Sequence, residues 1–530
     1  MYDYIIKNAT VYTGLNESPK QVDVAILDNK IKLISPTEEV DPKAKKIIDA
    51  EGYLLTPGFI DPHASTGFGY FFADAVNHKL HQGITTEVFG NCGVSPAPVG
   101  EHLVDSMKSL SNEVGFPFSW RSLEEYFEKI ENKLQFNIAT LIGHNTLRIG
   151  NMTDWGNLKA AQLVSMKQSL KFSMQEGALG LSTALVEPPG CFADIQEVVE
   201  LAKIVAAKGG VYAAHIRNEK NDVEEAVEEA LLVSKTAKVK ALLSHFKIAE
   251  EKNWGKIGKV LNMLEQFNED NPNIPVAIDV YPYTAMTNQL RGFVPKGYCD
   301  DEIINTTALF DKQALQNVEK YIEQNKYDLG KMLVISEEIK AFFGKTMKEI
   351  QIENGWTAAE TMAEVLSKNI GTWIAYHSIS QADVDKAILW KRAMVCTDSW
   401  SYPVNMESNI SEEPHPRSYG AFTSFLENYV VKNKKLTWQE AVYKITALPA
   451  TFFGLEGRGQ IKDGYYADLV LINPKSLKTN ATYLEPKKLS DGVEYLWVNG
   501  KIVIEDKVIN KSLAGKVLTL KRESVSPLTH

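Results

Sequence analysis

The sequence predicts an α/β fold, a (β/α)8 TIM-like barrel with a small β-sandwich domain that both ends of the chain build together. Three observations lead to this prediction. Apolar, strand-like runs alternate with helical patterns through the middle of the chain, which is typical of βα units around a parallel sheet. Short stretches of alternating polar and apolar residues occur near both ends. A chain of 530 residues is also too long for one ordinary core, so a second, smaller domain is expected.

Residues 1–56 and 451–530 are predicted to form the two parts of the β-domain. In the first part, "DYIIKNATVYTG" and "DVAILDNKIKLIS" alternate polar and apolar residues. The same pattern returns in "GQIKDGYYADLVLINP" and "GVEYLWVNGKIVIEDKVI", where Asn499-Gly500 is typical of a two-residue hairpin turn. Short antiparallel strands from both ends are therefore expected in one small domain.

Residues 57–450 are predicted to form the barrel. Eight apolar runs are candidates for its strands: 58–63, 85–92, 137–144, 177–183, 210–216, 240–245, 276–283 and 393–398. Eight βα units indicate a closed barrel. The run 372–378, "TWIAYHS", is an alternative strand that the pattern does not exclude. The segment from about 285 to 390 is too long for a single connection, and we expect an insertion there that acts as a lid.

Composition and charge narrow the class of protein. The net charge of −10 and the pI near 5.6 argue against a nucleic-acid partner, because binding phosphates requires clustered Lys and Arg. The sequence has no window of 18 uncharged apolar residues and no signal-like start, so we expect a cytoplasmic protein without a membrane partner. The four cysteines are widely spaced and do not suggest a disulfide scaffold. Any important cysteine is therefore expected to be a ligand or a nucleophile.

Chemically active side chains gather at the predicted strand ends, where the active sites of such barrels lie. The residues in question are His63, Cys92, His144, Ser182-Thr183, His215, His245, Tyr281-Tyr283 and Asp398. A thiolate with two imidazoles suits Zn²⁺ and leaves a fourth position for water. Zinc lowers the pKa of that water to about 7, and a nearby carboxylate can take and return the proton. Asp398 is placed for this role.

Several longer stretches carry a resemblance to a known family. They include "LLTPGFIDPH", "QGITTEVFGNCGVSPAP", "LIGHNTLR", "EGALGLSTAL", "GGVYAAHIRNE", "LLSHFKIAE", "IDVYPYTA", "CTDS", "HPRSYGAF" and "DGYYADLVLINP". In order and spacing the chain resembles, over nearly its full length, the D-aminoacylase (N-acyl-D-amino-acid deacylase) family of the amidohydrolase superfamily. The resemblance implies a metal-dependent barrel with a flanking β-domain that hydrolyses the amide of an N-acylated D-amino acid.

Individual positions follow from the same resemblance. Cys92, His215 and His245 match the family's tightly bound zinc ligands, and Asp398 matches its catalytic aspartate. Lys247 and Arg417, with Tyr281 or Tyr283, match positions that hold the substrate's carboxylate. An Arg fork and a Lys point charge both suit a carboxylate anion. His144 is also expected to contact the substrate.

The chain departs from the family pattern in two places. Where the family has His-x-His, this chain has His63-Ala64-Ser65, and a serine hydroxyl is a poor zinc ligand. We therefore expect one tight zinc site and a second position, at His63 and Asp398, that is weak or empty.

In "LVEPPG", related sequences tend to carry an aromatic residue where this chain has Glu187. Glu187 is expected either to face the pocket and repel acidic substrate side chains or to be an exposed loop residue.

Two other functions remain open at this level. One keeps the amidohydrolase chemistry but acts on a dipeptide or a cyclic amide. The other is a catalytically degenerate member that binds an acylated ligand without turnover, which the loss of one strand-end histidine favours. The presence of Cys92, His215, His245 and Asp398 argues against degeneration. The leading hypothesis is a zinc-dependent deacylase of N-acyl-D-amino acids.

Overall fold

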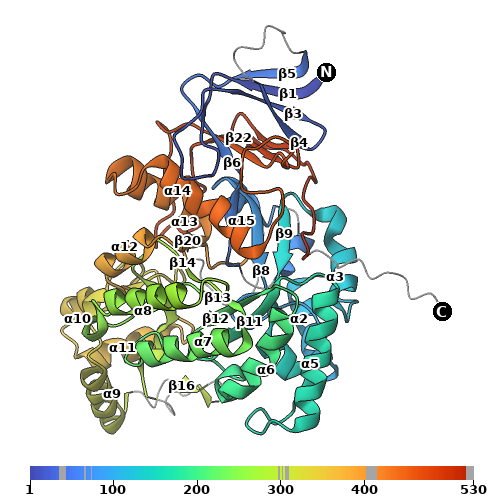
Figure 1. Cartoon of the computed structure of the whole chain (residues 1–530). Coiled ribbons are helices and arrows are strands. Elements are labelled where there is room, and N and C mark those ends of the chain that lie inside the picture. The colour runs from blue at the N-terminus through green and yellow to red at the C-terminus, as the bar shows by residue number, and fades with distance from the viewer. Residues whose placement is uncertain are drawn as a thin grey trace.

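The computed structural model describes residues 1–34, 43–64, 67–72, 74–295, 299–300, 303–304, 310–401 and 415–520. Figure 1 shows a β-domain at one end of the molecule, built from the two ends of the chain, and a barrel surrounded by helices below it. This arrangement confirms the predicted fold class. Ser65, on which the expected weakness of a second metal position depends, lies outside the described residues.

Eight parallel strands of the described chain form the barrel. They are β7 (Phe59–Asp61), β8 (Ile84–Phe89), β9 (Asn137–Thr140) with its continuation β10 (Ile142–Gly143), β11 (Gly180–Ala184), β12 (Val211–His215), β13 (Lys240–Leu243), β14 (Val276–Val280) and β20 (Ala393–Val395). Their order around the barrel follows the sequence, and a parallel bridge between Ala64 and Ser399 joins the last strand to the first. Each strand overlaps one of the eight runs predicted from the sequence, and β8 and β11 each extend one residue beyond theirs. Nearly every strand residue is buried, as expected when helices cover a parallel sheet.

Helices cover the outside of the barrel. Those between the strands include α5 (Ala160–Gln175), α6 (Ile195–Ala206), α7 (Val223–Ala237), α8 (Ile257–Asp270) and α12 (Gln381–Leu389). The helix α6 begins where the Asp194 side chain accepts a hydrogen bond from the Glu197 N–H, and it buries Val198, Leu201 and Val205 at helical spacing. Further helices outside the insertion described below are α1 (Asn77–Leu80), α2 (Val104–Val114), α3 (Leu123–Ile130), α4 (His144–Asn151), α13 (Arg417–Phe425), α14 (Trp438–Ile445) and α15 (Ala447–Phe453).

Two sheets form the β-domain. One has the order β4-β3-β1-β5, with β1 (Tyr2–Lys7), β3 (Asp23–Leu27), β4 (Lys30–Ile34) and β5 (Ala44–Asp49). The other joins both chain ends: β2 (Thr10–Val11), β6 (Leu54–Pro57), β21 (Leu469–Ile472), β22 (Val493–Val498), β23 (Lys501–Glu505) and β24 (Val508–Ile509). Ile6, Val24, Leu55, Leu471 and Trp497 pack in the core of this domain. Asn499 and Gly500 have φ of 48° and 77° and connect β22 to β23, as the hairpin signal predicted.

An insertion with its own core precedes the last barrel strand. Its antiparallel sheet places β19 (Trp373–Tyr376) between β15 (Met286–Gln289) and β18 (Met332–Val334), so the run 372–378 is not a barrel strand. Its other elements are β16 (Cys299–Asp300), β17 (Ile303–Ile304), α9 (Lys312–Asn325), α10 (Met347–Asn354) and α11 (Ala358–Lys368). Buried apolar residues such as Leu290, Met332 and Ile374 form a cluster separate from the barrel core. Its role as a lid and the exact domain boundaries stay predictions.

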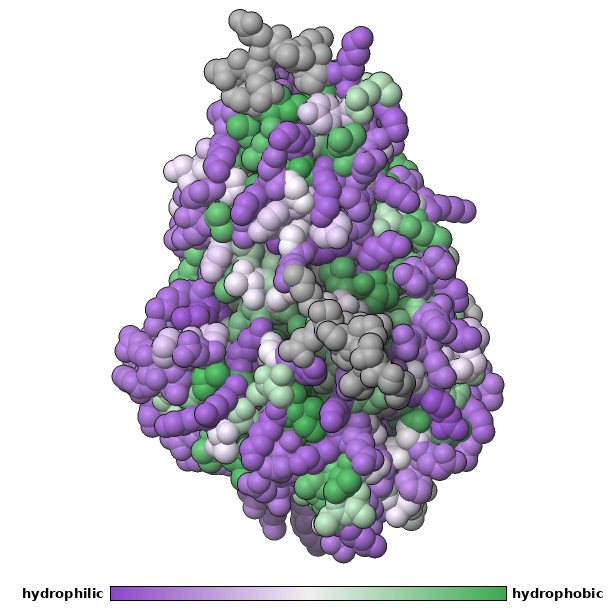
Figure 2. Space-filling model, turned by 45° about the vertical axis from the view of Figure 1, so that its right-hand side comes forward, coloured by the Kyte–Doolittle hydropathy of each residue, from purple (hydrophilic) through white to green (hydrophobic). Residues whose placement is uncertain are grey.

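The surface in Figure 2 is mainly hydrophilic, with hydrophobic side chains in small groups. Scattered exposed apolar residues of this kind are normal for folded domains. Within the described ranges, no helix is both long enough and apolar enough to cross a membrane.

Candidate metal centre

The carboxyl ends of the barrel strands bring the predicted metal residues together. Cys92 follows β8, His215 ends β12, His245 follows β13 and Asp398 follows β20. Cys92, His245 and Asp398 have φ values of 50°, 35° and 46°, a left-handed conformation that non-glycine residues rarely adopt. Such backbone strain persists only where the surroundings impose it, and it is concentrated at functional sites. Here it occurs at three residues of one cluster.

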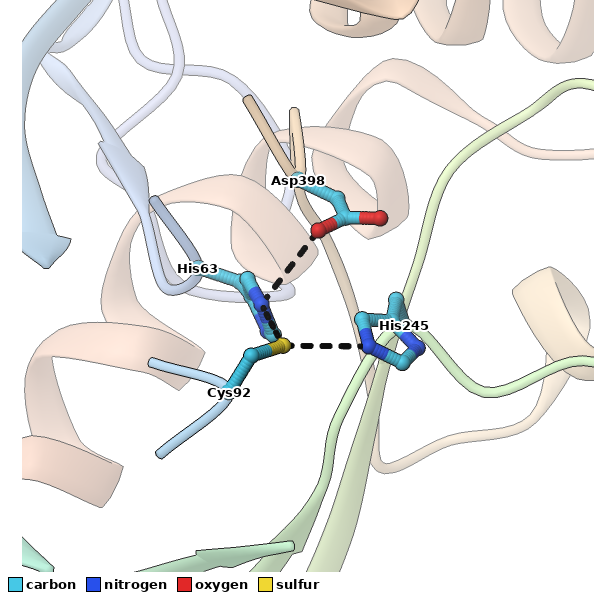
Figure 3. A group of neighbouring side chains, drawn as sticks. All are labelled: His63, Cys92, His245 and Asp398. Carbon is cyan, nitrogen blue, oxygen red and sulfur yellow. Dashed lines mark hydrogen bonds and ion pairs between the residues drawn. The ribbon is translucent and has the colours of Figure 1, made fainter. Parts of the chain in front are cut away.

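The side chains of this cluster meet at close range. The Cys92 Sγ lies 3.2 Å from the His245 Nε2 and 3.3 Å from the His63 Nε2. The His245 Nε2 lies 3.2 Å from the His215 Nδ1, and the His63 Nε2 lies 3.4 Å from the Asp398 Oδ1. Figure 3 shows His63, Cys92, His245 and Asp398 directed toward one another from different strand ends. One thiol, three imidazoles and one carboxylate therefore converge.

Two groups in this cluster have metal-ligating spacing. His63, Cys92, His245 and Asp398 offer ligand atoms that all lie within 4.8 Å of one another, and so do His215, Glu219 and His245. Ligands of a tetrahedral zinc ion at 2.0–2.3 Å from the metal are roughly 3.3–3.7 Å apart. The distances of 3.2 Å from the His245 Nε2 to the Cys92 Sγ and to the His215 Nδ1 come close to that spacing. The donor set and its geometry thus fit a zinc ion.

Charges around the cluster favour the metal-binding form of the cysteine. Burial raises the pKa of the Cys92 thiol, but the adjacent His245 and His63 rings outweigh it, and the pKa is well below its ordinary value. The thiolate is the form that binds metals. Burial also raises the pKa of Asp398, but the Arg417 guanidinium and the neighbouring histidines shift it below its usual range. The Asp398 carboxylate is therefore ionised at neutral pH.

Two cations and an aromatic ring lie beside the cluster. The Arg417 Nε donates to the Asp398 carbonyl oxygen at 2.8 Å, and the Arg417 Nη2 lies 3.3 Å from the Asp398 Oδ2. The Lys247 Nζ lies 2.9 Å from the His245 Nδ1. Both cations approach the Tyr281 ring, with the Arg417 Cζ 5.0 Å and the Lys247 Nζ 5.8 Å from its centre. Lys247, Arg417 and Tyr281 are thus grouped at the metal centre.

Comparisons with known proteins agree with this geometry. The model of the amidohydrolase family matches residues 46–214 and 411–504. An N-acyl-D-aspartate deacylase from Alcaligenes xylosoxydans xylosoxydans is 28% identical over 522 residues, which cover 97% of this chain and 95% of the relative. The crystal structure of an N-acyl-D-glutamate deacylase from Bordetella bronchiseptica, complexed with zinc and a phosphonate inhibitor, matches with a TM-score of 0.79 and 27% identity over 98% of this chain and 99% of that one. The chain belongs to the amidohydrolase family.

A solved D-aminoacylase gives a further match, with a TM-score of 0.78 and 27% identity over 98% of this chain and 100% of that chain. That structure addresses the functional role of the binuclear metal centre in D-aminoacylase, where one metal activates and a second metal attenuates. The present protein is a metal-dependent amidohydrolase related to the N-acyl-D-amino-acid deacylases.

Three other residues expected to bind substrate have different surroundings in this amidohydrolase. His144 is fully buried, and its Nε2 lies 2.8 Å from the Glu197 Oε1. The Tyr283 hydroxyl donates to the Pro416 carbonyl oxygen at 3.4 Å. Glu187 is exposed in the loop after β11, and its carbonyl oxygen accepts from the Cys191 N–H. These contacts lie outside the metal cluster, and the substrate roles of the three residues stay predictions.

Two carboxylates at the centre of the amidohydrolase were missed by the sequence reasoning. The Asp279 Oδ1 accepts a hydrogen bond from the His245 N–H at 2.8 Å and lies 3.3 Å from the His63 Nδ1. The sequence contained a signal for Asp279, because an acidic residue inside the apolar run 276–283 would be buried and would need partners. Glu219, whose Oε1 lies 2.7 Å from the Lys247 Nζ, follows His215 by four residues.

A buried ionic network behind the site was also missed. The Lys79 Nζ donates to the Asp61 Oδ2 at 3.1 Å and also to Glu87, and all three side chains are buried. The Asp61 Oδ1 accepts from the backbone N–H groups of His63 and Thr397, at 3.2 and 3.1 Å. Asp61 thus fixes the ends of the first and last barrel strands, which carry His63 and Asp398.

Proposed function

We propose that this amidohydrolase removes the acyl group from N-acyl-D-amino acids, using one zinc ion held by Cys92, His215 and His245. The observation that carries the proposal is the convergence of these three ligand atoms beside an ionised Asp398. The proposal is also supported by relatives named for deacylation of N-acyl-D-aspartate and N-acyl-D-glutamate, each of which matches nearly the whole chain.

The proposed reaction is hydrolysis of the acyl C–N bond. A bound zinc ion lowers the pKa of a coordinated water to about 7 and polarises the acyl carbonyl. Asp398 takes a proton from the attacking water as the new C–O bond forms. Asp398 then gives this proton to the amide nitrogen as the C–N bond breaks. The products are a carboxylate and the free D-amino acid, so protons balance without another reactant.

The substrate's carboxylate is assigned to the two cations at the site. Arg417 offers a planar fork and Lys247 a point charge, both suited to a carboxylate. If Arg417 and Lys247 hold the carboxylate and a zinc ion on Cys92, His215 and His245 polarises the acyl carbonyl, two points of the substrate would be fixed, and the two enantiomers would direct their side chains differently. The relatives' substrates suggest that the enantiomer accepted is D.

A zinc titration tests the proposal. Protein stripped of metal with a chelator should gain activity toward N-acetyl-D-leucine linearly with added zinc, up to a break at about one equivalent per chain. The expected reason is that three good ligands form one site, whereas the sequence has serine at residue 65, where the family resemblance implies a histidine for the second position. Amine release, measured at each zinc concentration, gives the position of the break.

Matched cysteine variants control this titration. Cys92→Ser should bind zinc weakly and remain inactive at one equivalent, because it removes the thiolate ligand. Cys191→Ser, which changes a half-buried free cysteine elsewhere, should behave like the wild type. A break at two equivalents would contradict the single-site assignment. Absence of hydrolysis at any zinc concentration would contradict the proposed function.

A further inference from the structure

One carboxylate faces the outer nitrogens of both proposed histidine ligands. The Glu219 Oε1 lies 3.2 Å from the His245 Nδ1 and 3.7 Å from the His215 Nε2. The other nitrogens of these rings, His245 Nε2 and His215 Nδ1, are the pair that lies 3.2 Å apart at the metal position. Each ring therefore has one nitrogen toward the metal position and the other toward Glu219.

This arrangement matches a general requirement of metal-bound imidazoles. A histidine that ligates a metal through one nitrogen carries a proton on the other, and that N–H usually donates to a carboxylate, a carbonyl or water. The acceptor fixes the tautomer and the orientation of the ring. In this chain, a single Glu219 oxygen is near the outer nitrogen of both rings.

Lys247 gives a second reason why a carboxylate acceptor is needed beside His245. The Lys247 Nζ lies 2.9 Å from the His245 Nδ1 and 2.7 Å from the Glu219 Oε1. An ammonium and a protonated Nδ1 are both donors, so they need an acceptor between them. The Glu219 Oε1 is within reach of both and can satisfy both.

The position of Lys247 also argues against a second metal ion at this place. His215, Glu219 and His245 have the spacing of a metal site. The Lys247 ammonium, however, already contacts two of these three groups and supplies the positive charge next to the carboxylate. The role of an outer acceptor fits Glu219 better than the role of a metal ligand.

The chain around Glu219 holds it in place. The Ala249 N–H donates to the Glu219 carbonyl oxygen at 2.8 Å, which ties the loop after β12 to the loop after β13. In the same loop, Arg217 pairs with Glu229 and donates to the carbonyl oxygens of Cys191 and Ala193. The Glu219 side chain is only 13% exposed. The backbone of the loop that carries Glu219 is therefore held by neighbouring segments, and the Glu219 side chain is largely buried.

We infer that Glu219 is a positioning residue that orients both His215 and His245 toward the zinc ion and thereby sets the affinity of the chain for zinc. The inference deepens the proposed function and rests on the proposed zinc site. Glu219 does not touch the reacting atoms, and it acts through the two histidines and through Lys247.

Zinc affinity in Glu219→Gln tests the inference without relying on turnover. Loss of an outer acceptor at a zinc histidine weakens metal binding by about 10–100-fold. We expect a loss of this size in the zinc dissociation constant, measured by competition with a chromophoric chelator. Glu219→Asp keeps the charge on a shorter side chain and should recover part of the lost affinity.

Another glutamate that pairs with a lysine provides the matched control. Glu251 also pairs with a lysine, since its Oε2 lies 2.7 Å from the Lys331 Nζ, but it is exposed. Glu251→Gln should keep the wild-type zinc affinity. Melting temperatures of the metal-free proteins distinguish positioning from general stability.

The outcomes separate the inference from the function on which it rests. Zinc binding by Glu219→Gln within twofold of the wild type would overturn the inference, and so would a lower melting temperature with unchanged affinity. If Glu219→Gln does not fold, a wild-type affinity in Glu219→Ala, which also lacks the acceptor, would overturn it instead. A wild-type chain that binds no zinc would contradict the proposed function itself.

Discussion

Asp398→Asn is expected to lower kcat for N-acetyl-D-leucine by roughly 10²–10⁴-fold, which is the usual contribution of a general acid–base group. The amide of Asn has nearly the shape of the carboxylate but cannot accept the proton of the attacking water. The Arg417 Nε donates to the backbone carbonyl oxygen of residue 398, so this contact should survive the change. Steady-state kinetics on zinc-loaded protein give the measurement.

Zinc content and a control variant show whether the loss of kcat in Asp398→Asn comes from the missing carboxylate. The variant should still bind about one zinc, because Cys92, His215 and His245 are unchanged. Asp385→Asn also removes a carboxylate that pairs with a cation, here Lys435, but it lies on α12 outside the site, and it should leave kcat unchanged. An Asp398→Asn enzyme that keeps more than a tenth of the wild-type kcat would show that another group transfers the proton.

Arg417→Ala is expected to reduce kcat/KM for an N-acetyl-D-amino acid by about 10–150-fold. Charge-assisted hydrogen bonds to a carboxylate contribute about 1.5–3 kcal/mol, and 1.4 kcal/mol corresponds to a tenfold change. The loss should appear mainly as a higher KM, because the interaction holds the substrate before and during the reaction. Initial rates over a range of substrate concentrations measure it.

A carboxamide substrate separates two effects of Arg417→Ala, one on binding of the substrate's carboxylate and one on Asp398. Arg417 also lies 3.3 Å from the Asp398 carboxylate, so its removal can alter the proton-transfer group. That effect should be common to N-acetyl-D-leucine and its carboxamide, whereas loss of carboxylate binding should affect only the acid. We expect the wild-type preference for the acid to shrink in the variant. An unchanged preference would remove Arg417 from the carboxylate site.

The barrel could be predicted because its strands carry a strong local signal. Buried parallel strands appear as short apolar runs, and a polar residue follows where the strand reaches the functional face. Runs such as 240–245 and 393–398 therefore identified both a strand and its end residue. The run 372–378 was ambiguous because a short apolar segment does not indicate which sheet it joins, and it pairs with β15 and β18 in the insertion.

The candidate site was only partly accessible from the sequence. Strand ends and the family resemblance selected Cys92, His215, His245 and Asp398, which the structure brings together. Glu219 was not selected because it lies in an irregular loop, where a spacing of four residues does not show which way a side chain faces. Asp279 was not selected because its partners, His63 and the His245 N–H, come from other strands. Such contacts depend on how the strands close into a barrel.

Enantiomer selectivity tests the central claim most directly. Zinc-loaded protein should hydrolyse N-acetyl-D-amino acids, and the matching L-enantiomers should react at least about 10²-fold more slowly, because a bound carboxylate and carbonyl leave the wrong enantiomer's amide misplaced. Chiral chromatography of the amino acid released from racemic N-acetyl-leucine gives the result in one experiment. Release of the D-amino acid alone is the predicted outcome. Equal release of both enantiomers would contradict the assignment of this amidohydrolase as a deacylase of N-acyl-D-amino acids.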